Sequence, residues 1–266
     1  MKKITLISLL MAHNIFSQTL IPNPPEVSAT SFLLIDAKTK TVITSSEPNQ
    51  STGLASITKI MTSYVVADQI SKGFLTEDTM VDISEECWRM EGSRMFIKEG
   101  TEVSISELLK GVIIQSGNDA SCALAEKIAG SQSAFADLMN NYAEQLGLEN
   151  TNFVNPTGLP DINHYSTAND IAKLSIRLIE DFPDNYALFK EKEYTFNNIR
   201  QLNRNSLLWQ DDSIDGIKTG HTNASGYCLV ASAKRDEMRL IAVTLNSTSE
   251  TVSYTHLRAH ETKSYR

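Results

Sequence analysis

Apolar and polar residues alternate at both ends of the chain, whereas the middle shows the three-to-four-residue spacing of helices. Near the N-terminus, SFLLIDAKTKTVITSSEP alternates around a turn at 37–40 and predicts a β-hairpin. Near the other end, 227–233 and 239–245 predict a second hairpin that turns at 234–237. Between the hairpins, apolar spacing predicts helices at 56–71, 104–114, 120–129, 133–146 and 167–179.

This order of elements predicts an α+β fold. Strands distant in sequence can pair into one antiparallel sheet, flanked by helices, while the intervening helices form an all-helical lobe. A functional site is then expected in the cleft between the sheet and the lobe. The last predicted helix begins with Thr167 followed by Asp170, which is the spacing of a capping box.

Composition and charge narrow the class of protein. The chain has 266 residues, of which 41% are hydrophobic and 21% charged, as in ordinary globular proteins large enough for one domain or two lobes. The formal net charge of -8 argues against nucleic-acid binding, which depends on clustered Lys and Arg.

The first residues predict export from the cytoplasm. Two lysines and a short apolar stretch in MKKITLISLLMAHNIFSQ are typical of a secretory signal peptide over residues 1–17. The stretch is too short for a stable membrane span. Residues 18–30, which include IPNPPEV, are expected to form an extended linker.

Cysteine and histidine spacing gives no metal-binding pattern, so we expect no metal and no cofactor. Cys87, Cys122 and Cys228 are scattered without a CxxC or Cys/His spacing and are interpreted as free, mostly buried thiols. His164 and His221 are likewise too isolated in the sequence to be proposed as metal ligands.

One short stretch, GLASITKIMTSY, pairs a candidate nucleophile with a candidate base. Ser56 and Lys59 lie three residues apart, nearly one helical turn, and are therefore neighbours. A hydroxyl attacks only when a nearby group takes its proton, and a lysine can do so only when its pKa is depressed. A helix-capping serine followed by a solvated lysine would show the same spacing.

Two later segments carry further candidate groups. IIQSGNDASC places Ser116 and Asn118 between two predicted helices, where they can reach a cleft or simply cap the second helix. DGIKTGHTNASGY places Lys218, Thr219 and Gly220 on a short predicted strand. Gly220 would let a substrate backbone lie close to that strand, although an edge strand protected by a lysine would look similar.

The three segments together form the ordered set SxxK, SxN and KTG. With SITKIMTSYV, LLKGVIIQSGNDASCALAE and FKEKEYTFNNIRQLNRNSLLW, this set resembles the D-alanyl-D-alanine carboxypeptidases of the low-molecular-weight penicillin-binding proteins. The resemblance runs from about residue 31 to about 244. It implies a penicillin-binding/β-lactamase-like fold and a carboxypeptidase domain over residues 31–250.

The resemblance implies a role for each motif residue. Ser56 would attack the penultimate D-Ala carbonyl of peptidoglycan stem peptides, releasing the terminal D-Ala and forming an acyl-enzyme that water hydrolyses. Lys59 would act as the general base. Ser116 and Lys218 would relay the proton to the leaving amine, and Asn118 would hydrogen-bond the peptide side of the substrate.

The resemblance also implies how the substrate is held. The backbone N–H groups of Ser56 and His221 would form an oxyanion hole. Thr219 and Arg204 would help bind the terminal carboxylate beside Gly220. β-Lactam antibiotics resemble the D-Ala-D-Ala terminus and would acylate Ser56 as covalent inhibitors.

Two regions depart from the family pattern. The segment ECWRMEGSRMF, 86–96, is shorter than the corresponding loop in the relatives. Residues 251–266 show no resemblance and are interpreted as a non-native read-through tail, so we expect the natural chain to continue past Ser249. The resemblance implies a periplasmic enzyme, associated with the inner membrane only through a C-terminal anchor missing from this chain.

Two other functions stay open at this point. A class A β-lactamase shares the motifs, but the segment LENTNFVNPTGLPD offers Glu149 without the ExxLN-like pattern of that class. A non-catalytic penicillin sensor or cell-wall binding module would bind penicillin covalently and release no D-Ala. The sequence leaves open whether pentapeptides or cross-linked muropeptides are preferred.

Overall fold

A five-stranded antiparallel sheet joins the two ends of the described chain. The computed structural model describes residues 28–249; the predicted signal peptide, most of the linker and the predicted tail at 251–266 lie outside them. The strand order is β2-β1-β9-β8-β7. The bounds are β1 Ala29–Asp36, β2 Val42–Ser46, β7 Ile214–Thr222, β8 Gly226–Arg235 and β9 Met238–Ser247.

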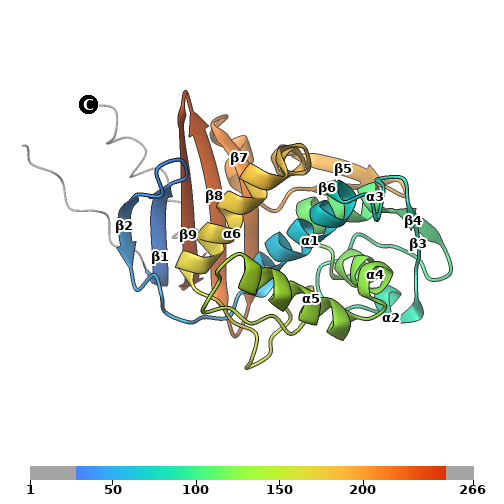
Figure 1. The fold of residues 1–266 in the computed structure, drawn as a ribbon. Coiled ribbons are helices and arrows are strands. Elements are labelled where there is room, and N and C mark those ends of the chain that lie inside the picture. Colours follow the sequence, from blue (N-terminus) through green and yellow to red (C-terminus); the bar gives the residue numbers. More distant parts are fainter. Residues whose placement is uncertain (1–27, 250–266) are drawn as a thin grey trace, which may run out of the picture.

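Both predicted hairpins are confirmed, and the edge strand β7 is longer than the short strand predicted there. β1 pairs with β2 and β8 with β9, and β1 also pairs with β9 from the opposite end of the sequence. The KTG segment, predicted as a short strand, lies within the nine-residue β7, which pairs with β8 at the edge of the sheet. The motif therefore lies where the sheet meets the helices (Figure 1).

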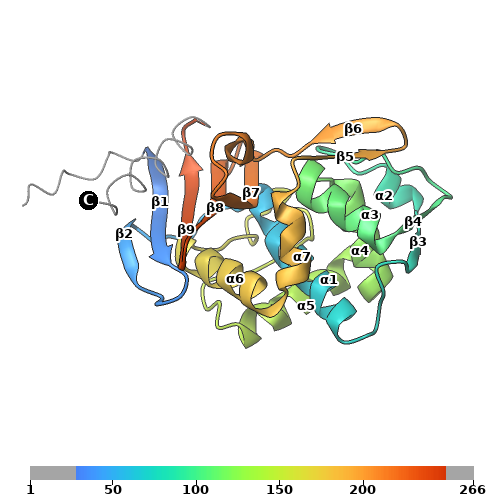
Figure 2. The same ribbon diagram turned by 90° about the horizontal axis from the view of Figure 1, so that it is seen from above.

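The predicted helices are present; α6 lies on the sheet, and the others form a lobe beside β7 (Figures 1 and 2). The predicted 104–114 helix consists of two parts in the structure. Its first part is the α-helix α3, and its last residues form η2, a segment with the wider hydrogen bonding of a π-helix. The helical elements are η1 Ala55–Thr58, α1 Lys59–Ser71, α2 Glu85–Trp88, α3 Ile105–Lys110, η2 Gly111–Gln115, α4 Asn118–Ala129, α5 Gln132–Gln145, α6 Ala168–Asp181, α7 Pro183–Tyr186, η3 Ala187–Lys190 and η4 Ser206–Trp209.

The lobe is not purely helical, because it also contains two small antiparallel pairs. β3 Met80–Asp82 pairs with β4 Glu102–Ser104, and β5 Glu193–Phe196 pairs with β6 Ile199–Leu202. Strands of three or four residues are too short to give a clear alternation of apolar and polar positions.

One continuous hydrophobic core joins the sheet to the lobe. The helix α1 lies at its centre and is buried on every side from Lys59 to Ala67. Because this part of α1 has no face exposed to solvent, its first residue, the charged Lys59, is buried as well. The helix α6 packs across the sheet against β1 and β9 (Figure 2).

A disulfide corrects the interpretation of the cysteines as free thiols. Cys87 in α2 and Cys122 in α4 are bonded, whereas Cys228 is free and buried. The two partners lie 35 residues apart in sequence, yet the packing of α2 on α4 brings their Cα atoms to 5.3 Å. That distance is within the usual range for a disulfide, and spacing in the sequence alone does not predict such an approach.

Candidate active site

Ser56 and Lys59 are neighbours in space, and neither of them fits the capping alternative. Ser56 lies in η1, and Lys59 is the first residue of α1, whose N-cap is Thr58. In the part of the chain that the structure describes, no side chain caps either helix start, and Lys59 is fully buried. The Lys59 Nζ atom lies 3.1 Å from Ser56 Oγ. The geometry therefore favours a nucleophile and its base over a cap and a solvated lysine.

The contacts of Lys59 define which way its amine points. Besides Ser56 Oγ, Nζ contacts Asn118 Oδ1 and the Thr157 carbonyl oxygen, each at 2.7 Å. These two oxygens can only accept hydrogen bonds, so a neutral amine would give them its two N–H groups. Its lone pair would then face Ser56 Oγ, as a general base requires.

Two buried lysines at the site have lowered pKa values. Burial lowers the pKa of Lys59 well below its usual value, and the nearby Lys218 lowers it further, as Arg204 does, against an opposing effect of Asp119. Burial, together with Arg204, lowers the pKa of Lys218 to about 7. Both causes disfavour the charged amine, so the site provides the lysine pKa that the SxxK spacing alone could not establish.

The second motif forms a tight turn between η2 and α4. Ser116 adopts the left-handed conformation with φ 67°, which turns the chain sharply at the end of η2. Its buried Oγ has no hydrogen-bond partner among residues 28–249. Asn118 is held by its own contacts, since Nδ2 donates to the Glu91 carbonyl and the backbone N–H donates to the Ser93 carbonyl. The Glu91 contact fixes Oδ1 as the atom facing Lys59.

The third motif lies against the nucleophile. Thr219, Gly220 and His221 of β7 line one cavity of about 380 Å³ together with Ser56, Ser116 and Arg204. A Cβ atom at Gly220 would lie 2.9 Å from the Ser56 backbone N, closer than real contacts allow, so glycine lets β7 approach η1. Lys218 is buried and donates to the Thr219 carbonyl at 3.2 Å.

All the residues predicted for the site are therefore brought to one place, in two layers. Six of them line the cavity: Ser56, Ser116, Arg204, Thr219, Gly220 and His221. The other predicted residues, Lys59, Asn118 and Lys218, are buried. Lys59 connects the layers because it contacts both Ser56 and Asn118.

Sequence reasoning missed groups that hold this arrangement in place. Asp119 accepts hydrogen bonds from the backbone N–H groups of Met95 and Phe96 and so fixes the 86–96 segment beside the site. Its position directly after the SxN motif was the available signal. The Thr157 carbonyl gave no signal, because a backbone oxygen is independent of residue type.

His164 contacts Thr58, two residues after the nucleophile in η1. Its Nδ1 accepts from the Val154 N–H, so the proton of the neutral ring is on Nε2, which lies 2.7 Å from Thr58 Oγ1. Burial lowers its pKa to about 4, against an opposing effect of Asp161 and with a small contribution from Lys59. The ring is therefore neutral near pH 7 and acts as a structural contact.

Within the described residues, the potential metal ligands that gather in one place are Cys87, Cys122 and Glu126, and the disulfide occupies both sulfurs. The described residues also include no helix with the length and hydropathy needed to span a bilayer.

A family match and a similar curated protein point to the same family. Residues 18–249 match a family described as D-alanyl-D-alanine carboxypeptidase. The chain is 44% identical over 246 residues to D-alanyl-D-alanine carboxypeptidase DacA of Escherichia coli K12, a match covering 90% of this chain and 61% of that protein. The chain thus spans 61% of the length of this curated relative.

Solved structures show the same fold. Penicillin binding protein 5 from Haemophilus influenzae superposes with a TM-score of 0.86 at 42% identity, covering 89% of this chain and 70% of that one. Penicillin binding protein 6B from Escherichia coli gives a TM-score of 0.85 at 41% identity, covering 91% and 78%. The fold expected from the sequence motifs is confirmed.

Proposed function

Since the chain belongs to the D-alanyl-D-alanine carboxypeptidase family, we propose that it removes the terminal D-Ala from peptidoglycan stem peptides through an acyl-enzyme on Ser56. The observation that carries this proposal is the Lys59 amine, buried 3.1 Å from Ser56 Oγ between two acceptor-only oxygens. The predicted signal peptide supports action in the periplasm.

Acylation begins when Ser56 Oγ attacks the carbonyl carbon of the penultimate D-Ala. The hydroxyl proton passes to Lys59 Nζ, because burial and the nearby Lys218 lower the pKa of this amine and favour the neutral form that can accept a proton. The backbone N–H groups of Ser56 and His221 stabilise the oxyanion, in line with the close approach of β7 to η1. The C–N bond then breaks, and the leaving D-Ala amine takes a proton relayed through Ser116 Oγ.

Substrate recognition uses the cations at the cavity. Arg204 and Thr219 line it and bind the terminal carboxylate, because a guanidinium can donate two parallel hydrogen bonds to a carboxylate. Lys218 contributes positive charge from the buried layer. Asn118 holds Lys59 with Oδ1, and of its two amide N–H groups one donates to the Glu91 carbonyl; the other serves the peptide side of the substrate.

Deacylation repeats the same proton transfers with water. A water molecule attacks the ester carbonyl while Lys59 accepts one of its protons. The proton then returns to Ser56 Oγ when the acyl group leaves. A β-lactam acylates Ser56 by the same route, but its ring amine stays tethered to the acyl group. The proposal therefore includes long-lived inhibition by β-lactams.

Release of D-Ala from a peptide ending in Lys-D-Ala-D-Ala tests the proposal. The wild-type protein is expected to release D-Ala in a reaction that penicillin blocks, and Ser56→Ala is expected to abolish it. Ser63→Ala is a matched control, since Ser63 is also buried but lies further along α1. Covalent penicillin binding without D-Ala release would instead identify a non-catalytic penicillin sensor, and rapid β-lactam turnover would identify a β-lactamase.

A further inference from the structure

The loop at 147–166, between α5 and α6, touches the catalytic helix at its tip. The Thr157 carbonyl accepts from Lys59 Nζ, and the Pro156 carbonyl accepts from Thr62 Oγ1, both at 2.7 Å. The two acceptors bind side chains nearly one turn apart on α1. The loop therefore contributes a direct partner of the proposed general base without placing a side chain there.

The tip of this loop is held as a unit. Asn155 Oδ1 accepts from the backbone N–H groups of Thr157 and Gly158, at 3.1 and 2.7 Å. Gly158 has φ +84°, and a Cβ atom there would lie 1.7 Å from the Ala55 carbonyl oxygen. The turn thus lies against η1, and the position of the Thr157 carbonyl depends on how the whole loop is seated.

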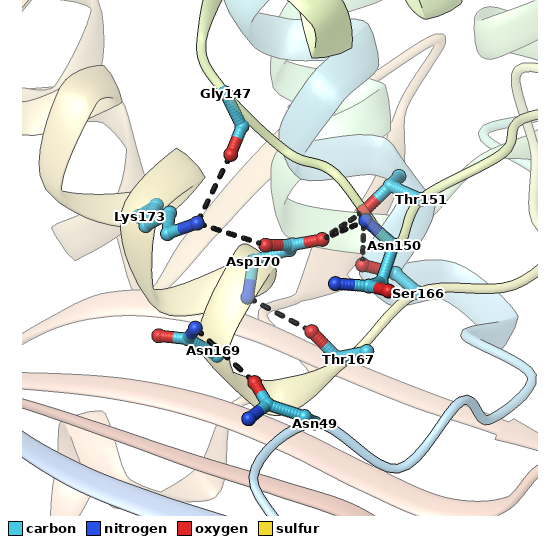
Figure 3. Close-up of polar contacts among 9 residues, drawn as sticks. All are labelled: Asn49, Gly147, Asn150, Thr151, Ser166, Thr167, Asn169, Asp170 and Lys173. Carbon is cyan, nitrogen blue, oxygen red and sulfur yellow. Dashed lines mark hydrogen bonds and ion pairs between the residues drawn. The ribbon is translucent and has the colours of Figure 1, made fainter.

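The neck of the loop is tied to α6 by one buried carboxylate (Figure 3). Asp170 is 1% exposed, and its Oδ2 atom accepts from the Asn150 N–H at 2.8 Å and from Thr151 Oγ1 at 3.0 Å. Thr151 Oγ1 also lies 2.7 Å from Ser166 Oγ, at the other side of the neck. One carboxylate oxygen therefore closes the loop where it leaves and rejoins the helices.

Two further contacts connect this neck to rigid parts of the molecule. Thr167 Oγ1 accepts from the Asp170 backbone N–H, so half of the predicted capping box is present and the first turn of α6 is fixed. Ser166 exchanges backbone hydrogen bonds with Thr52, four residues before the nucleophile. The Asp170 carboxylate serves the loop instead of completing the capping box.

We propose that Asp170 is a positioning residue for the reaction on Ser56: by closing the 147–166 loop it places the Thr157 carbonyl that orients Lys59. The inference rests on the proposed function. Removing the carboxylate leaves the Asn150 N–H and the Thr151 hydroxyl without their acceptor, so the neck loosens or admits water. Water that follows the loop toward its tip reduces the burial of Lys59.

The charges that face Lys59 do not lie on α6. They are Lys218 on β7, Asp119 on α4 and Arg204 after β6, and the neutral His164 ring faces it from the loop itself. A change at Asp170 therefore reaches Lys59 through the position of the loop. Because hydration favours the protonated amine, loosening the loop raises the pKa of Lys59 and moves the acid limb of the acylation rate to higher pH.

Two substitutions separate the oxygen of Asp170 from its charge. Asp170→Ala removes the acceptor, whereas Asp170→Asn keeps one oxygen, and both loop donors bind the same oxygen in the native protein. Lys173→Gln is the control, since Lys173 contacts the opposite oxygen, Oδ1, at 3.2 Å and is partly exposed. The second-order rate constant for acylation by a fluorescent penicillin is measured against pH for each protein.

In Asp170→Ala the second-order rate constant for acylation is expected to fall roughly ten- to hundredfold near neutral pH, because small misplacements of catalytic groups have effects of this size. The acid limb of its pH profile should also move to higher pH. Asp170→Asn and Lys173→Gln should keep the wild-type limb. An unmoved limb in Asp170→Ala with a lowered melting temperature would overturn the proposal, leaving Asp170 a stabilising residue only.

A second variant decides the question if Asp170→Ala does not fold. Thr151→Val removes one donor to Asp170 and the contact with Ser166 while keeping the carboxylate. A smaller upward displacement of the limb supports the proposal, and a wild-type limb overturns it. Wild-type D-Ala release and acylation are measured first, so their absence would count against the proposed function and not against the role of Asp170.

Discussion

The chemistry depends on a lysine that is buried with no carboxylate in contact with its amine among residues 28–249. Lys59 contacts a hydroxyl, an amide oxygen and a backbone carbonyl, and Lys218 lies close enough to disfavour its charge. The SxxK spacing predicted that Ser56 and Lys59 are neighbours, but the pKa follows from burial by the whole lobe. A sequence pattern describes which residues are near each other, and it does not describe their solvation.

Neutralising Lys218 is expected to make Lys59 a worse base near neutral pH. The positive charge of Lys218 lowers the pKa of Lys59, so its removal in Lys218→Met makes the protonated form of Lys59 less unfavourable and raises that pKa. The acid limb of the β-lactam acylation profile should then move to higher pH. Lys218→Arg keeps the charge and serves as the control; a limb that stays in place or moves to lower pH in Lys218→Met would refute this coupling.

At the scale of elements, the site is assembled where β7, η1, α4 and the 147–166 loop meet. The sequence predicted the hairpins, the main helices and the three motifs, because each carries a local signal. Asp119, the Thr157 carbonyl and the Cys87–Cys122 bond were not predicted, since their importance lies in contacts between distant segments. The same reason explains why the short β3–β4 and β5–β6 pairs were missed.

Gly220→Ala should push β7 away from the nucleophile. The added Cβ would lie 2.9 Å from the Ser56 backbone N and 3.1 Å from Ala55 Cβ. Overpacking of this kind typically costs about 1–3 kcal/mol of stability, and it would also displace the His221 N–H from the proposed oxyanion hole. Stopped-flow acylation and urea unfolding measure the two effects; unchanged acylation would show that the approach of β7 is not needed for the reaction.

Removing the disulfide should destabilise the lobe more than it impairs chemistry. The bond joins α2 to α4 across 35 residues, a loop length for which chain entropy gives about 3 to 4 kcal/mol. The double substitution Cys87→Ala, Cys122→Ala should lower the free energy of unfolding by this amount in a urea titration. Cys228→Ala is the control for the loss of a cysteine outside the bond. If the wild-type protein had the same free energy of unfolding with and without a reductant, the prediction would be contradicted.

For the whole molecule, the sheet holds the site together from both ends of the described chain. β1 and β9 pair along their length, and β8 connects them to β7 at the lobe. This long-range closure could be predicted in outline from hairpins at both ends, whereas the strand order could not be read from either hairpin alone. The result is one frame that presents Thr219, Gly220 and His221 to Ser56.

The central claim is that Ser56 is the nucleophile activated by Lys59, and intact-protein mass spectrometry after mixing with benzylpenicillin tests it most directly. The account predicts a single adduct with the mass of the whole penicillin, mapped by proteolysis to the peptide that contains Ser56. The adduct should be absent in Ser56→Ala and should form at least about a hundredfold more slowly in Lys59→Gln, the loss expected when a general base is removed. An adduct in folded Ser56→Ala, or one mapped to another residue in the wild-type protein, would contradict the account.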